Sequence, residues 1–175
     1  MTADEARALL HAPTGFEPTS PEAPREQCLA AVAGILATID GPRPWGGAYP
    51  RPLTVARLFR HPYQINETPH LIVVPDEGSQ LGPCGHDRVL YEDRFRLVVY
   101  GYVDGDDLVA PSTWATRLLF DVQRLLRQAL DPDGVLAPLA PGLRFLEESI
   151  AAEDYRAAFT LPVQVVLRYA LGMTL

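Results

Sequence analysis

The chain has 175 residues, of which 47% are hydrophobic and 21% are charged, and its formal net charge is −7. This length can bury the core of one domain, and the composition excludes wholesale disorder, which requires low hydrophobicity together with high net charge. The acidic balance argues against nucleic acid as the main partner, because proteins that bind the phosphate backbone need a basic face.

All fifteen cationic side chains are arginine, and the sequence contains no lysine. Schiff-base and P-loop lysine chemistry are therefore excluded. The bias has two readings: the mutational pressure of a GC-rich genome, or the suitability of the planar guanidinium for protein interfaces.

Cysteine content and the lack of targeting segments indicate where in the cell the protein is made. Its two cysteines, Cys28 and Cys84, do not make a disulfide framework. The N-terminus lacks the basic region and apolar run of a signal peptide, and no stretch approaches the roughly 18 apolar residues of a membrane span. We expect a protein made in the cytoplasm, with no membrane partner.

Two helices are predicted near the N-terminus. The first covers residues 3–11, within residues 1–20 that we expect to extend the domain. The second begins with Ser20 as its N-cap and ends before Gly41 as its C-cap, with an apolar stripe between them. An irregular, aromatic and proline-rich loop follows over residues 41–52.

The middle of the chain predicts strands. These are residues 53–59, residues 70–74 and the long strand 89–103, the last two separated by a Gly/Pro-rich connection over residues 76–87. In the long strand, the odd positions from Phe95 onward form an apolar stripe. Gly101 interrupts that stripe and indicates either a bulge or a close approach of another group.

The C-terminal part predicts one helix and two strands. Ser112 is the expected cap of the helix, which ends at the turn of residues 131–134. A strand over residues 143–150 is followed by an acidic turn and a final strand over residues 158–171. Pro162 places the start of that strand at a sheet edge or outside the ladder.

Strands and helices are thus segregated along the chain, without the regular alternation of a parallel α/β fold. This order predicts an α+β fold, in which helices pack on one face of a mostly antiparallel sheet. No internal repeat or linker divides the sequence, so we expect one domain over residues 1–175.

One cluster has the side chains of a metal site. Cys84, His86 and Asp87 lie together, with His61 and His70 upstream. Zinc sites use paired ligands at set spacings, which are missing here, so ordinary loop residues are the alternative reading. We expect no metal and no cofactor.

Catalytic motifs are equally weak. The acidic pairs fall at strand ends and turns, where carboxylates commonly face water, and Cys28 lies on an apolar helix stripe. The glycine pairs lack the strand-before, helix-after context of a phosphate loop. We therefore predict that the chain is not an enzyme.

A candidate interaction surface lies on the long strand. The face opposite its apolar stripe carries Arg94, Arg96, Tyr100 and Tyr102. Tyrosine and arginine are enriched at the energetic centres of protein interfaces, although they also suit a half-exposed sheet face.

Six segments follow one another along the chain: Ile39-Asp-Gly41, Val55-x-Arg57, PHLIVV at 69–74, FRLVVYGYV at 95–103, LLFDVQRLL at 118–126 and VVLRY at 165–169. Together they resemble the tail terminator (tail completion) proteins of long-tailed bacteriophages and gene transfer agents. The resemblance covers about residues 25–170 in the order and length of elements. The helix at residues 3–11 and the acidic segment at 147–154 depart from the family pattern.

The resemblance implies an α+β subunit of a virion, assembled in the host cytoplasm. Such proteins form a hexameric ring on the finished tail tube, stop its polymerisation and join it to the head–tail connector, or neck. DNA would pass through the lumen without specific binding, which an acidic subunit favours because like charges repel. The expected surface for neighbouring subunits and partners comprises Trp45, Tyr49, Arg57, Arg94, Arg96, Tyr100, Tyr102 and Arg168.

Two alternatives remain open at this stage. One is another neck or tail component, such as a head–tail adaptor or a tube subunit. The other is a small-molecule-binding or hydrolytic domain with a pocket near His61, His70 and His86.

Overall fold

The structure is a computed structural model that describes residues 22–39, 53–84, 90–137 and 140–170. These residues form an α+β fold with a mixed, mostly antiparallel sheet and helices on one face, so the predicted fold class is confirmed. The elements are α2 (Glu22–Leu36), β1 (Thr54–Ala56), η1 (Pro62–Gln64), β2 (His70–Pro75), β3 (Gln80–Cys84), β4 (Leu90–Asp104), α3 (Pro111–Gln128), β5 (Gly142–Phe145), β6 (Ser149–Ala152) and β7 (Arg156–Ala170).

The two long strands β4 and β7 form the centre of the sheet, whose order is β1-β2-β4-β7-β5. They pair antiparallel in unbroken register from Leu90 opposite Ala170 to Asp104 opposite Arg156. On the far side of β4, β2 and β3 pair with successive segments, and β5 and β6 do the same on the far side of β7. Among the strand pairs of the described residues, only the short β1–β2 pair is parallel.

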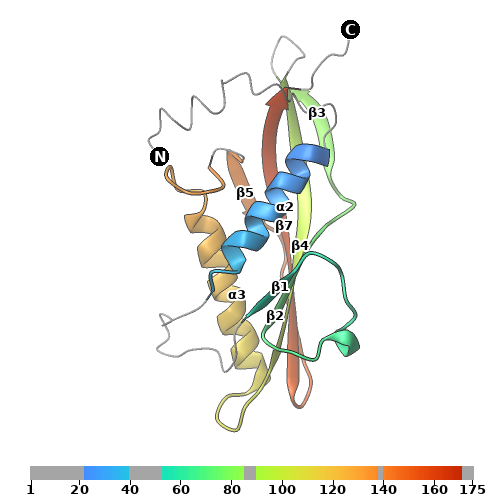
Figure 1. Cartoon of the computed structure of the whole chain (residues 1–175), viewed down its shortest axis with the longest axis vertical. Helices are drawn as coiled ribbons and strands as arrows, with labels where there is room; N and C mark the ends of the chain where they lie inside the picture. The colour runs from blue at the N-terminus through green and yellow to red at the C-terminus, as the bar shows by residue number, and fades with distance from the viewer. Residues whose placement is uncertain (1–21, 40–52, 85–89, 138–139, 171–175) are drawn as a thin grey trace.

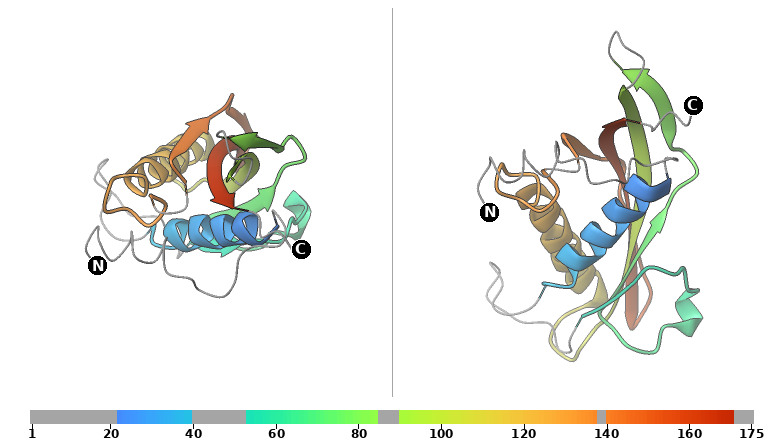
Figure 2. Two further views of the ribbon diagram at one scale, coloured as in Figure 1. Left: turned by 90° about the horizontal axis from the view of Figure 1, so that it is seen from above. Right: turned by 45° about the horizontal axis from the view of Figure 1, so that its top comes forward.

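Both helices pack on the same face of this sheet (Figure 1), and α3 lies along β4 and β7. Seen from above, the sheet curves around them (Figure 2). The core therefore forms between the apolar stripes of the helices and the odd-numbered residues of β4 and β7. Its fully buried members include Val32, Leu36, Leu118, Val122, Leu97, Val99, Leu161 and Val163.

Gly101 marks a close approach and not a bulge. The register of β4 with β7 continues through it, with Gly101 opposite Phe159. A Cβ atom at Gly101 would lie 2.1 Å from Phe159 Cε1, and the Phe159 ring is itself buried in the core. Glycine is therefore required here so that the aromatic ring can lie across the strand.

The prediction that Pro162 places the start of its strand at a sheet edge or outside the ladder is wrong. Pro162 lies inside β7, opposite Val98 of β4, and its other side faces the connection between β5 and β6. Its carbonyl accepts a hydrogen bond of 2.9 Å from the Leu146 N–H, in the connection between β5 and β6. Since the N and C=O of one strand residue point to the same side, the missing N–H faces the place where β5 ends and β6 has not begun.

Other boundaries also differ from the predictions. The strand expected over residues 53–59 is only β1, and the connection expected over residues 76–87 contains the edge strand β3. The strand expected over residues 143–150 is two strands, β5 and β6. In each case the partner strand, and not the local sequence pattern, sets where pairing begins and ends.

The start of α3 differs in a similar way. Ala110 is the N-cap and Pro111 the first helical residue, so Ser112 is not the cap. Asp106 instead organises the turn before the helix: its Oδ1 accepts hydrogen bonds from the N–H groups of Leu108 (2.9 Å) and Val109 (2.7 Å). The backbone N–H of Leu108 is the main cause that lowers the pKa of Asp106.

The helix predicted between Ser20 and Gly41 is confirmed as α2, although it ends at Leu36 in a tightened turn. Its proposed caps, Ser20 and Gly41, lie outside the described residues, as do the helix predicted at residues 3–11 and the loop at residues 41–52.

Candidate protein-interaction surface

The segment between β1 and β2, residues 57–69, folds over the sheet face that the helices leave uncovered; we call it the aromatic loop. Ile65 anchors it, because this side chain is buried against Ile72 of β2 and Tyr102 of β4. These residues form a second, small apolar cluster on the face opposite the main core.

An arginine from β7 holds the loop in place. Arg156 binds Asp104 with two hydrogen bonds, Nε to Oδ1 at 2.6 Å and Nη2 to Oδ2 at 3.2 Å. Its Nη1 donates to the carbonyl oxygens of Ile65 (3.0 Å) and Pro62 (3.3 Å). The Asp104 carboxylate raises the pKa of Arg156, so the guanidinium keeps its charge and cross-links loop, β4 and β7.

A single 3-10 turn shapes the tip of the loop. The His61 N–H donates to Gln64 Oε1 at 3.0 Å, and the Gln64 N–H donates to the His61 carbonyl at 2.8 Å. Pro62 begins the turn with its backbone angle already set. The tip is thus ordered by its own hydrogen bonds as well as by Arg156.

On this support the loop carries a row of rings. The imidazole of His61 stacks on Tyr63, with centroids 5.3 Å apart, and meets the edge of Phe59 at 5.4 Å. Phe59 in turn meets Tyr100 of β4 at 5.5 Å. Phe59, His61 and Tyr63 are exposed, Tyr63 to 78%, and Leu58 beside them is exposed too. An ordered, exposed aromatic cluster of this kind is typical of a protein-binding surface.

The structure separates the two tyrosines predicted for this surface. Tyr100 is half-buried and contacts the aromatic row through Phe59. Tyr102 lies on the predicted face but is only 4% exposed, because the aromatic loop covers it, and this burial raises its pKa. In the isolated chain, Tyr102 therefore supports the loop and does not offer a free surface.

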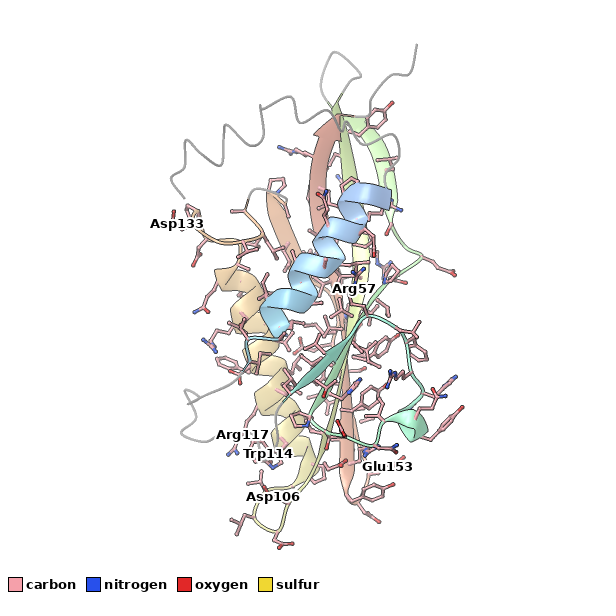
Figure 3. The ribbon with its side chains drawn as sticks, viewed as in Figure 1. Arg57, Asp106, Trp114, Arg117, Asp133 and Glu153 are labelled. Atoms are coloured by element: carbon pink, nitrogen blue, oxygen red, sulfur yellow. The ribbon has the colours of Figure 1, made fainter. Side chains whose placement is uncertain are left out.

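The predicted arginines fall in separate places. Arg57, at the start of the aromatic loop, pairs with Glu26 of α2 and is visible beside that helix (Figure 3). Arg96 pairs with Asp76 at 3.0 Å, where its side chain covers Gly78.

Arg94 and Arg168 do come together. They lie near the start of β4, whereas Tyr100 and Tyr102 lie near its end. Arg168 donates to Glu92 Oε2 at 3.0 Å, and Arg94 donates to Glu92 Oε1 at 3.4 Å. The hydrogen bond from Arg168 is the main cause that lowers the pKa of Glu92. The three exposed or half-exposed charges form a cross-strand row. Trp45 and Tyr49 lie outside the described residues.

The histidines do not form the predicted pocket in the described structure. His61 belongs to the exposed aromatic row, whereas His70 is buried in β2, with no hydrogen bond to its Nε2 from any described residue. Burial is the main cause that lowers the pKa of His70, and the charge of Arg60 adds to it. His86 lies outside the described residues.

Cys28 belongs to α2 and is fully buried in the main core. Burial, with the Asp93 carboxylate, raises its pKa to about 12, so the thiolate needed for nucleophilic chemistry is strongly disfavoured. Asp93 is buried on the core face and binds Arg25 at 2.6 Å and 2.9 Å. Arg25 also lies over the ring of Phe95, 5.5 Å from its centroid.

A shallow depression of about 320 Å³ lies between α2 and the end of β2. No histidine lines it, and its charged rim surrounds an apolar floor. The lining residues are Arg25, Glu26, Leu29, Pro75, Asp76, Glu77, Ser79 and Phe95. Across the described ranges, no three His, Cys, Asp or Glu side chains are grouped so that they could hold a metal ion.

Sequence reasoning missed the aromatic loop. The sequence pattern predicts a strand for Phe59 and a possible pocket for His61, and it does not indicate that the two rings share one surface. The signal that could have found it is the alternation of Phe59, His61 and Tyr63 around Pro62, which places three rings on a short, turn-forming segment.

None of the described helices is both long and apolar enough to cross a membrane. No protein-family model matches the chain, and no curated protein matches it.

Proposed function

We propose that this protein is a structural subunit that assembles through protein–protein contacts into a ring, closing the tail tube of a long-tailed phage or a related particle. In this role the ring stops tube polymerisation and provides the surface that joins the neck. The observation that carries the proposal is the exposed aromatic row of Phe59, His61 and Tyr63 on a loop that Arg156 holds in place.

The aromatic row is ordered before any partner binds, and this order lowers the cost of binding. Aromatic side chains bury large areas and lose little conformational entropy when they are already fixed. The stacked rings, the 3-10 turn and the Arg156 hydrogen bonds fix this surface in the free chain. Exposed apolar rings on a rigid loop are costly in water, which favours a partner that covers them.

Two further features support an assembly role. The α+β fold agrees with the fold that the resemblance to tail terminators implies. The strand order also leaves β1 at one end of the sheet and β5 and β6 at the other. Different surfaces at the two ends of a sheet are what a ring of identical subunits needs, because each copy meets the next through unlike patches.

The proposal is tested on polymerising tail tubes made from the tube protein of the same genome. Negative-stain electron microscopy should show a ring at one end of each tube and an arrest of growth at stoichiometric protein. Tubes that elongate at the rate seen without the protein, with bare ends, would contradict the proposal. A ring that binds the isolated connector but no tube would point instead to a head–tail adaptor.

A further inference from the structure

The strand β6 is an unusual edge. Its four residues, Ser149–Ala152, are all exposed, and among the described strands it pairs with β7 alone. It contains no charge, and Ile150 exposes 41% of its surface. An apolar edge strand with unpaired backbone groups is a site for association unless another surface covers it.

The surroundings of β6 are apolar and acidic. Glu147 and Glu148 precede it directly, and Glu148 accepts a hydrogen bond of 2.5 Å from Gln123 of α3. Phe120 lies three residues before Gln123, on the same side of α3, and is more than half exposed. We call Phe120, Glu147, Glu148 and Ile150 the β6 edge.

The aromatic loop has the complementary character. Arg60 is exposed between Phe59 and His61 in the sequence, whereas Arg57 is already paired with Glu26 of α2, and the first acidic residue of the loop is Glu67. The β6 edge therefore offers apolar surface with negative charge, and the tip of the loop offers apolar surface with the positive charge of Arg60. Such a match steers two surfaces toward each other and disfavours the pairing of either with itself.

We propose that the aromatic loop of one copy packs on the β6 edge of a second copy, with Arg60 of the loop meeting Glu147 of the edge. This inference rests on the proposed ring, for which it names the contact between subunits. The occupant is a second copy of this chain, because each copy carries both halves of one complementary pair. The two halves are different surfaces, so the contact is heterologous and leaves one of each free until a ring closes.

The first test disrupts the aromatic loop and the β6 edge in separate variants. Tyr63→Asp places a charge in the exposed aromatic row, and Ile150→Asp does the same on the β6 edge. Each should weaken self-association at least about tenfold in sedimentation velocity, as expected when a central interface residue is lost. Leu108→Asp is the matched control: Leu108 is 93% exposed at the β4–α3 turn, and its substitution should leave association unchanged. Thermal unfolding checks that all three variants fold.

The second test mixes the two broken variants. The Ile150→Asp protein keeps an intact loop and the Tyr63→Asp protein an intact edge, so together they can form one contact. We expect a heterodimer of one copy of each that grows no further. If both variants stay monomeric when mixed, or if Ile150→Asp alone still dimerises, the heterologous contact is wrong.

The third test exchanges the charges. Arg60→Glu and Glu147→Arg should each weaken association, and the chain that carries both substitutions should recover it, because every contact then has the reversed pair. Association of the wild type should also weaken with rising salt. A double variant as weak as the single ones would overturn the predicted pairing of Arg60 with Glu147.

These outcomes separate the contact from the function. Rings that cap tubes normally while carrying Tyr63→Asp and Ile150→Asp would refute the contact and leave the proposed function standing. If the mixed variants form the expected heterodimer but the wild-type chain never binds tubes, the contact stands and the proposed function is refuted. A wild-type chain that remains monomeric at about 1 mM, a concentration that populates even weak contacts, refutes the contact outright.

Discussion

The two faces of β4 and β7 are covered in different ways. On one face, α2 and α3 bury a continuous apolar core that includes Phe95, Phe159 and Leu161. On the other face, the aromatic loop covers only a small cluster around Ile65 and Tyr102, and the hydrogen bonds of Arg156 hold it there.

The difference shows how one sheet serves two purposes. Burial of apolar side chains supplies most of the stability, so the helix-covered face is committed to folding. The loop-covered face needs little apolar burial because charge-assisted hydrogen bonds fix its position. Its aromatic rings therefore remain available to a partner.

The largest expected effect is on the helix-covered face. Gly101→Ala puts a Cβ atom 2.1 Å from Cε1 of the buried Phe159 ring and should lower the free energy of unfolding by about 3 kcal/mol. Chemical denaturation measures the change. Gly82→Ala is the control, since nothing lies within 4 Å of a Cβ at that strand position. Equal losses in the two variants would show that strand glycines, and not the Phe159 contact, set the cost.

A smaller and local effect is expected on the other face. Arg156→Gln removes the donors to the Ile65 and Pro62 carbonyls and should cost about 1–2 kcal/mol. Hydrogen exchange should rise in the aromatic loop while β4 stays protected. Arg144→Gln, an exposed arginine on β5, is the charge-matched control. Loop exchange that stays at the wild-type rate would show that Arg156 does not hold the loop.

The smallest effect depends on pH. The pKa of His70 is lowered from 6.5, so below that pH the unfolded chain takes up a proton that the folded chain does not. The free energy of unfolding should therefore fall as the pH drops below 6.5, by at most about 1.4 kcal/mol per pH unit from this group. His70→Leu should remove that part of the slope, with no difference in slope above about pH 7.5. Identical slopes for both proteins would contradict a contribution of His70 to the pH dependence, and a steeper loss of stability in His70→Leu would contradict its sign.

Long periodic segments were predictable from sequence. The apolar stripes of β4, β7 and α3 fixed their type and face, and the segregation of strands from helices predicted the fold class. Short elements were not predictable. The segment that forms β3 contains Gly82 and Pro83, and its composition is typical of a loop. Pro162 looked like an edge residue because the gap between β5 and β6 exists only in three dimensions.

The candidate surface was harder to predict, for the same reason. Tyr100 and Tyr102 were placed on the correct face, but a segment thirty or more residues earlier decides which of them is exposed. The spacing of aromatic and basic residues cannot reveal that Arg156 reaches back to the carbonyls of Pro62 and Ile65. Surfaces built by long-range contacts follow from the fold and not from local pattern.

The most direct test of the assembly account is the solution mass of the wild-type chain, measured by light scattering from about 10 µM to about 1 mM. We predict that the mass rises from 19.2 kDa to a plateau at a fixed multiple, as a closed ring requires, and that Tyr63→Asp stays at 19.2 kDa. A wild-type mass that remains at 19.2 kDa over the whole range, or a Tyr63→Asp variant that reaches the same plateau, would contradict it.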